Sequence, residues 1–206
     1  VVTWNEDLNA LEKQRIAASE TRRLGVGIMG VADMLNQLGV SYDSKEGIDI
    51  ITRVMEFITN AAYQASASLA GEKGASPIYS EDEYMECPFL EAALSQETQT
   101  FIRENGIRNI AIMSIAPTGS ISNIIKGFQI DDKNYIGVSG GVEPIFALYY
   151  TRRTESFKKT EFYKVFHSTV QAYIDKMNLQ EEIDSNEKME DILPDYFHRT
   201  AHHINP

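Results

Sequence analysis

The stretch from residue 109 to residue 127 constrains the fold of this 206-residue chain most strongly. Asn109 to Ile115 is an apolar run of strand length, and Pro117 to Gly119 has the composition of a tight turn. Ser120 to Lys126 has the length of a short helix that ends at Gly127. The chain is therefore expected to pass from a strand through a tight turn directly into a helix.

The same turn is a candidate anion site. The first amides of a helix have no intrahelical partner, and the helix dipole places partial positive charge there. Gly119 removes the side chain that would hold a phosphate off, and hydrogen bonds to a charged group contribute about 1.5 to 3 kcal/mol each. The absence of a following Gly-Lys-Ser/Thr argues against a P-loop hydrolase, and an ordinary capped turn is the alternative. The candidate substrate-binding residues are Pro117, Thr118, Gly119, Ser120, Ile121 and Ser122.

Composition excludes several classes of function. The formal net charge of -11 would repel a nucleic-acid backbone, so sequence-blind nucleic-acid binding is not expected. Cys87 is the only cysteine, which rules out an internal disulfide and favours a cytoplasmic setting. No apolar run has the length of a membrane span, and the first residues do not resemble a signal peptide. Because the chain opens without Met and stops at Pro206, we expect a fragment of a longer protein.

The remaining elements follow from hydrophobic periodicity. Asp43 and Glu46 resemble a capping box, and the apolar seam from Ile48 to Leu69 behind it favours a helix packed on a sheet over a coiled coil. Helices are expected at residues 7–19, 31–38, 46–69, 95–105 and 160–177, a buried strand at 145–150, irregular chain at 71–94 and a solvated acidic tail at 181–191.

Three further motifs have simpler structural explanations. Gly25 to Gly30 matches the GxGxxG pattern, but no apolar strand precedes it, so close packing of a helix against its neighbour is the favoured interpretation. His198, His202 and His203 include the four-residue spacing of metal ligands, yet no further ligand is evident, and no metal site is assigned. Cys87 lies in the irregular stretch and is assigned no chemistry.

Four stretches, in order, resemble the large catalytic subunit of ribonucleotide reductases. Each resembles one part of that family's barrel: a run after the central strands, the substrate-phosphate turn, the next strand and a segment near the barrel's end. They are Arg22 to Asp33, Arg108 to Ser122, Ser139 to Phe146 with Tyr150 to Arg153, and Leu193 to His202. The resemblance implies the later half of a ten-stranded α/β barrel, with residues 1–206 forming part of a single catalytic barrel domain truncated at both ends.

The resemblance also implies chemistry for the parent enzyme. In this family a cysteine thiyl radical takes a hydrogen from the ribose of a ribonucleoside di- or triphosphate, and a cysteine pair supplies electrons. With Cys87 alone, the fragment is expected to be inactive and to hold no catalytic residue. Only the phosphate-binding role of Pro117 to Ser122 carries over. Glu143 and Pro144 match a family motif and are taken as structural, whereas the link Gly127 to Val138 is longer than in the family.

The sequences of Pro117 to Ser122 and of Val142 to Ala147 are more similar to those of the adenosylcobalamin-dependent class of this family. The alternative radical source is a diiron or dimanganese subunit. The implied partners are a ribonucleotide, a thioredoxin-like reductant and a second copy of the parent. Two other functions stay open: an NAD-dependent dehydrogenase that uses Gly25 to Gly30, and a non-catalytic interaction module that uses the seam from Ile48 to Leu69.

Overall fold

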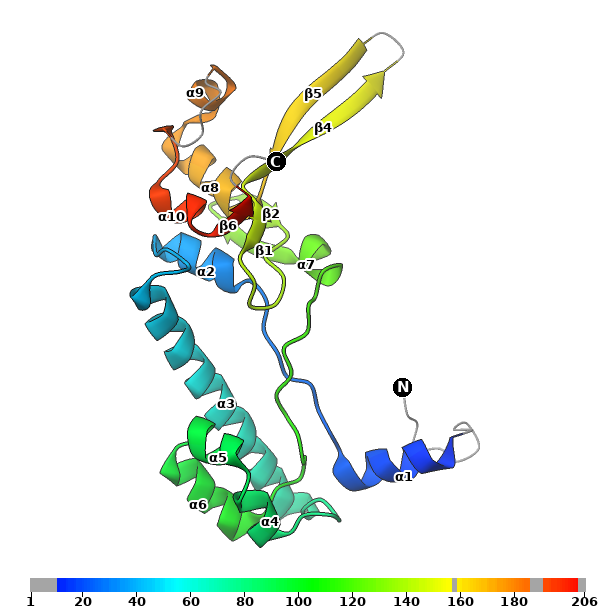
Figure 1. The fold of residues 1–206 in the computed structure, drawn as a ribbon. Coiled ribbons are helices and arrows are strands. Elements are labelled where there is room, and N and C mark those ends of the chain that lie inside the picture. Colours follow the sequence, from blue (N-terminus) through cyan, green and yellow to red (C-terminus); the bar gives the residue numbers. More distant parts are fainter. Residues whose placement is uncertain (1–10, 157–158, 186–190, 204–206) are drawn as a thin grey trace. The chain divides into compact units, whose positions relative to one another are not determined.

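The computed structural model describes residues 11–156, 159–185 and 191–203, and the ribbon in Figure 1 follows the chain through helices and short strands. The helices are α1 (Glu12–Thr21), α2 (Val31–Leu38), α3 (Lys45–Lys73), α4 (Glu81–Met85), α5 (Pro88–Ala93), α6 (Gln96–Asn105), α7 (Ile121–Ile124), α8 (Ser168–Met177), α9 (Gln180–Ser185) and α10 (Asp195–His198). The strands are β1 (Lys126–Ile130), β2 (Lys133–Ile136), β3 (Ile145–Ala147), β4 (Tyr149–Ser156), β5 (Lys159–Phe166) and β6 (Ala201–His203).

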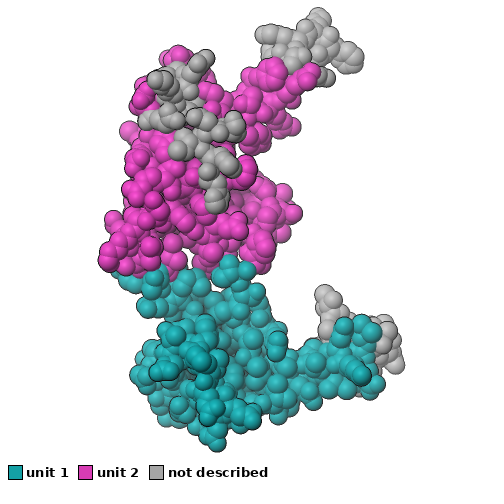
Figure 2. Space-filling view, viewed as in Figure 1, with its two compact units in different colours: residues 1–27, 52–115 teal, residues 28–51, 116–206 magenta. Residues whose placement is uncertain are grey.

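The chain divides into two compact units, coloured separately in Figure 2. Unit 1 comprises residues 1–27 and 52–115, and unit 2 comprises residues 28–51 and 116–206. Among the described helices, none is long and apolar enough to cross a membrane.

Unit 1 is built from helices around one apolar cluster. The predicted helix at 95–105 is confirmed as α6, because Ser95 caps it by accepting a hydrogen bond from the Thr98 amide at 3.2 Å and Gly106 ends it. The expected packing of α3 on a sheet is wrong: its second half packs against α5, α6 and the segment that follows α6. The cluster consists of Tyr63, Ala67, Leu90, Leu94, Ile102, Ile107 and Ile112.

The segment at 71–94 is not irregular as expected, because it contains α4 and α5. Pro88 is the first residue of α5, a position at which proline needs no amide partner and its fixed φ suits the helix. Leu90 lies in this helix and Leu94 directly follows it, and both side chains are buried in the cluster. The short helices therefore contribute to the core of unit 1 and are not a surface excursion.

The predicted strand at 109–115 pairs with the glycine-rich segment near residue 26. The two segments run parallel and meet in a bridge between Val26 and Met113. The amide of Val26 donates to the Ile112 carbonyl at 2.8 Å, and the amide of Ser114 donates to the Val26 carbonyl at 2.9 Å. The strand expected at 109–115 is therefore reduced to a single bridge at Met113, and its pairing with the glycine-rich segment was not predicted.

Unit 2 combines helices with three two-stranded sheets. Strands β1 and β2 pair antiparallel, β4 and β5 pair antiparallel, and β3 pairs parallel with β6, so that Ile145 lies opposite Ala201. In the described part of the chain no sheet exceeds two strands, so closure of a ten-stranded barrel stays a prediction. The buried core of unit 2 consists of Ala32, Ile145, Leu148, Phe166, Val170, Ile174, Ile183, Leu193 and Phe197.

The single helix expected at 160–177 is wrong in its first half. Residues up to Phe166 form β5, paired with β4 from Tyr149↔Phe166 to Ser156↔Lys159, and only Ser168–Met177 is helical as α8. The predicted strand at 145–150 is divided between β3 and β4. The acidic tail begins with helix α9, whose Ile183 is buried rather than solvated.

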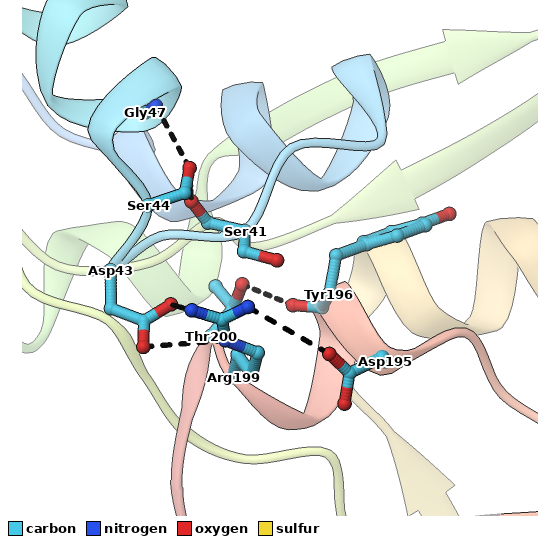
Figure 3. Close-up of polar contacts among 8 residues, drawn as sticks. All are labelled: Ser41, Asp43, Ser44, Gly47, Asp195, Tyr196, Arg199 and Thr200. Carbon is cyan, nitrogen blue, oxygen red and sulfur yellow. Dashed lines mark hydrogen bonds and ion pairs between the residues drawn. The ribbon is translucent and has the colours of Figure 1, made fainter.

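The start of α3 differs from the predicted capping box by one residue (Figure 3). Ser44, not Asp43, caps the helix, because its hydroxyl oxygen accepts a hydrogen bond from the Gly47 amide at 3.0 Å. The carboxylate of Asp43 instead pairs with the guanidinium of Arg199, which follows α10, at 3.0 Å. The segment just before α3 is thus linked by an ion pair to the residue that follows α10.

Candidate functional site

The predicted phosphate turn lies at the start of α7, which is one turn long and ends at Ile124 rather than Lys126. Thr118 adopts a left-handed backbone conformation with φ of 52°, which is unusual for a β-branched residue. The turn closes on itself, because the Ser122 amide donates to the Thr118 carbonyl at 2.9 Å. The side-chain amide of Asn123 also donates to the Gly119 carbonyl, at 2.5 Å.

Several donors of the turn are available to a ligand. Within the described residues, the backbone amides of Thr118, Gly119, Ser120 and Ile121 have no hydrogen-bond acceptor. Ser120 is exposed and its hydroxyl caps no amide of α7. A Cβ atom added at Gly119 would meet nothing within 4 Å, so open space lies beside the backbone. Successive free amides beside open space are the arrangement that an anion site needs.

The three hydroxyl side chains of the turn do not behave alike. Ser122 is buried, and its hydroxyl contacts the Gly119 carbonyl at 3.5 Å, so its amide and hydroxyl both serve the turn itself. The Thr118 hydroxyl oxygen accepts a hydrogen bond from the Gly141 amide at 2.8 Å and keeps its own proton to donate. Thr118 and Ser120 are therefore the two hydroxyls that remain for a ligand.

The glycine-rich loop at residues 137–141 packs against the turn. A Cβ atom added at Gly140 would lie 2.7 Å from the Pro117 carbonyl oxygen, so only glycine allows the two backbones to approach this closely. The amide of Val138 donates to the Ser122 carbonyl at 2.8 Å, and the Gly137 amide donates to the Ile125 carbonyl at the same distance. The loop after β2 is thus bonded to both ends of α7.

The glycine-rich loop is itself held in place by the buried carboxylate of Asp33. Asp33, in the first turn of α2, is 2% exposed and accepts a hydrogen bond from the Ser139 amide at 2.5 Å. Its other oxygen lies 3.5 Å from the His167 ring and 3.4 Å from the Ser168 hydroxyl. Burial lowers the pKa of His167 below its ordinary value, and the neighbouring Asp33 opposes that shift without reversing it. Sequence reasoning missed Asp33, although it ends the matched stretch Arg22 to Asp33.

A cavity of about 530 Å³ adjoins α7 within unit 2. Asn123, the residue that bonds Gly119, lines it together with His167, Tyr149 and Tyr150. Residues 117–122 do not line this cavity, so the open space at Gly119 is separate from it.

The link from Gly127 to Val138 is a β-hairpin anchored on α8. Tyr135 donates a hydrogen bond to the Asp175 carboxylate at 2.7 Å, and Lys133 forms an ion pair with the same group. Burial raises the pKa of Tyr135 to about 12, and the hydrogen bond to Asp175 adds to the effect. Although burial alone would raise the pKa of Asp175, the hydrogen bonds from Lys133, Tyr135 and Gln171 lower it. The longer link therefore packs as an ordered element.

The Gly25 to Gly30 motif does not form a phosphate loop. A Cβ atom added at Gly27 would lie 2.1 Å from the Ser114 carbonyl oxygen, because the glycine segment pairs with the chain around Met113. Gly30 adopts a left-handed conformation with φ of 80° at the start of α2. The glycines serve close backbone approach, as expected, but to an extended segment rather than to a helix.

The other candidate groups are structural or lie outside the described residues. His198 is buried in α10, with its Nε2 3.3 Å from the Leu193 carbonyl, whereas the side chains of His202 and His203 are not described. Cys87 is exposed at the start of α5 in unit 1. Across the described residues no group of three His, Cys, Asp or Glu side chains has the arrangement of a metal site.

Comparisons with known proteins agree on one family. Residues 2–206 match the family described as ribonucleotide reductase, barrel domain. The vitamin B12-dependent ribonucleoside-diphosphate reductase of Mycobacterium tuberculosis (strain CDC 1551 / Oshkosh) is 37% identical over 66% of this chain and 16% of its own length. The enzyme of the same name from Thermoplasma acidophilum is 30% identical over 90% of this chain and 22% of its own.

Relatives without that cofactor in their names also match. The ribonucleoside-diphosphate reductase subunit alpha of Helicobacter pylori (strain ATCC 700392 / 26695) is 31% identical over 68% of this chain and 19% of its own length. Among solved structures, the class Id ribonucleotide reductase alpha subunit of Actinobacillus ureae shares the fold with a TM-score of 0.61 at 19% identity, covering 96% of this chain and 30% of that one. The chain thus spans a minor part of the proteins it matches.

Proposed function

The chain belongs to the ribonucleotide reductase barrel-domain family, and we propose that within its parent enzyme it supplies the turn that binds the phosphates of the substrate. The observation that carries this proposal is the run of free amides from Thr118 to Ile121 beside the open space at Gly119. The exposed Ser120 hydroxyl and the Thr118 hydroxyl add donors. A diphosphate held by backbone amides needs no lysine, which fits an acidic chain.

The proposed parent reaction is the reduction of ribonucleoside diphosphates, or triphosphates, to deoxyribonucleotides. Support comes from the family match and from relatives named ribonucleoside-diphosphate reductases. In this proposal both units are parts of one barrel domain, whose ten strands include segments outside residues 1–206. The role of this chain is to orient the substrate: amides at Thr118 to Ile121 fix the phosphates and so place the ribose relative to the radical cysteine of the parent.

For the radical source we propose adenosylcobalamin in the parent, because the relatives from Mycobacterium tuberculosis and Thermoplasma acidophilum are named vitamin B12-dependent. When bound, this group supplies the radical that begins the reaction. Neither of the two histidines whose side chains have described contacts is set up as a ligand for this group, because His198 is buried against a backbone carbonyl and the Nδ1 atom of His167 faces Asp33. A thioredoxin-like reductant and a second copy of the parent complete the proposed partners.

Calorimetry with the full-length parent enzyme tests the phosphate role. The double variant Gly119→Val, Ser120→Ala fills the open space and removes one hydroxyl. Since hydrogen bonds to charged groups are worth about 1.5 to 3 kcal/mol, we expect its dissociation constant for cytidine diphosphate to rise at least about tenfold. Its affinity for cytidine, which has no phosphate, should not change.

The matched control is Ile124→Ala in the same helix, because Ile124 is 77% exposed and lies beyond the turn. This variant should bind cytidine diphosphate as the unchanged enzyme does. Unaltered diphosphate binding by the double variant would refute the proposed role of the turn.

A further inference from the structure

We propose that Asp33 is a positioning residue for the phosphate turn: its buried carboxylate holds the loop at Ser139 to Gly141, which in turn fixes the conformation of Thr118. This inference rests on the proposed function, because it concerns how the free amides are held for the phosphates. Asp33 lies within α2 and does not belong to the turn or to the residues expected to contact substrate.

The backbone of Ser139 is held by hydrogen bonds on both sides. Its amide donates to the Asp33 carboxylate at 2.5 Å, and its carbonyl accepts from the Gly30 amide at 2.9 Å. Both backbone groups of Ser139, which is 4% exposed, are therefore bonded to the start of α2. Without the carboxylate, the Ser139 amide would be left buried and unpaired, so the loop would have to move toward another acceptor or toward water.

The loop at Ser139 to Gly141 contacts the phosphate turn directly. The residues directly after Ser139 meet the turn at two points: the Gly141 amide donates to the Thr118 hydroxyl, and the Gly140 backbone packs against the Pro117 carbonyl. A movement of the loop by a fraction of an ångström therefore reaches the turn, because neither contact leaves room for adjustment.

The turn itself is strained at Thr118, whose φ is 52°. A left-handed conformation at a β-branched residue persists only where the surrounding structure enforces it. The hydrogen bond from Gly141 is the one described interaction that holds the Thr118 side chain in place. If it is lost, Thr118 can relax toward an ordinary conformation, and the amides of Gly119 and Ser120 then turn away from a common point.

The carboxylate is suited to this role by its surroundings. It lies in the first turn of α2, where the helix dipole favours negative charge, and the Ser168 hydroxyl faces its second oxygen. The His167 ring lies 3.5 Å from the same oxygen. These groups hold the Asp33 side chain in one orientation, so the position of Ser139 is tightly defined.

The test compares the dissociation constants of the full-length parent enzyme for cytidine diphosphate and cytidine. Asp33→Ala should weaken binding of the diphosphate about tenfold and leave cytidine binding unchanged, the outcome of losing about one good hydrogen bond to a charged group. Asp33→Asn, whose amide oxygen can still accept from Ser139, should restore binding to within about threefold of the unchanged enzyme.

The matched control is Asn36→Ala, one turn further along α2. Asn36 is also buried, and its side chain bonds Thr169 at 3.4 Å instead of the loop. This variant should lower the thermal midpoint without altering the ratio of the two dissociation constants. A purely structural role for Asp33 would make Asp33→Ala behave like Asn36→Ala, and that result would overturn the inference.

A second variant alters the contact between the loop and the turn directly. Gly140→Ala places a methyl group against the Pro117 carbonyl and should lower diphosphate affinity with cytidine binding unchanged. An unchanged affinity here would overturn the inference even if Asp33→Ala did not fold. If Gly119→Val also leaves the affinity for cytidine diphosphate unchanged, the turn binds no phosphate and the proposed function fails. If Gly119→Val weakens this binding whereas Asp33→Ala does not, only the positioning role of Asp33 fails.

Discussion

The close approach at Gly27 leads to a quantitative prediction for Gly27→Ala. The added Cβ atom would lie 2.1 Å from the Ser114 carbonyl oxygen, whereas ordinary contact begins near 3.4 Å, so the two segments must separate by about 1.3 Å. This separation breaks the hydrogen bonds that join Val26 to Ile112 at 2.8 Å and Ser114 to Val26 at 2.9 Å, because such bonds weaken beyond about 3.2 Å.

The expected cost follows from these contacts. Two backbone hydrogen bonds at about 1 kcal/mol each, together with at least about 1 kcal/mol for overpacking, amount to roughly 3 kcal/mol. Hydrogen exchange of the full-length parent, followed by mass spectrometry, measures the local opening of both segments. Amides around Val26 and Ser114 should exchange roughly 150-fold faster in the variant, the ratio that corresponds to this free energy.

Gly119→Ala is the control for this experiment, because its Cβ atom would meet nothing within 4 Å and its φ lies outside the left-handed region. It should leave exchange unchanged in both segments. If Gly27→Ala altered exchange less than about threefold, the paired segments would not approach as closely as described, and the GxGxxG pattern would need another explanation.

Two further predictions concern unit 2. Ser44→Ala should destabilise the first turn of α3 by about 1 kcal/mol, which is measured as faster hydrogen exchange of the Gly47 amide. Asp43→Ala should leave the exchange of that amide unchanged. The reverse result would support the predicted capping box at Asp43. The second prediction follows from the lowered pKa of His167. In the unfolded chain this histidine binds a proton below about pH 6.5, whereas in the folded chain it does so only at lower pH. The free energy of unfolding should therefore fall as the pH drops from about 6.5, by at most about 1.4 kcal/mol per pH unit. Thermal midpoints from pH 7.5 to 5 should show a shallower decline for His167→Asn, and equal slopes would contradict the shift.

Elements with local end signals were predictable from the sequence. Gly39 ends α2 in a left-handed conformation, and Ser95 and Gly106 bound α6, as their residue types indicate. The failures lie where one residue type suits two structures. Pro88 suggested a break but begins a helix, and Phe162, Val165 and Phe166 have helical spacing yet form β5, whose partner strand is contributed by the chain just before it.

The candidate site was predictable in part for the same reason. The turn at Pro117 to Ser122 could be located because proline, glycine and hydroxyl residues act over a few positions. The loop that holds the turn in place could not be predicted, because the hydrogen bond from Ser139 to Asp33 joins residues 106 positions apart and leaves no periodic signal in the sequence. The internal use of Ser122 was also hidden, since a buried serine and an exposed one look alike in sequence.

The parallel pairing of β3 with β6 has a consequence for synthesis of the protein. Ile145 finds its partner Ala201 only after roughly fifty further residues have been added, which at about 5 to 20 residues per second takes several seconds. Until then β3, whose central residue is the hydrophobic Phe146, is an open edge on the nascent chain. Ribosome-bound intermediates of this length are therefore the stage at which a chaperone that binds extended apolar segments would be needed most.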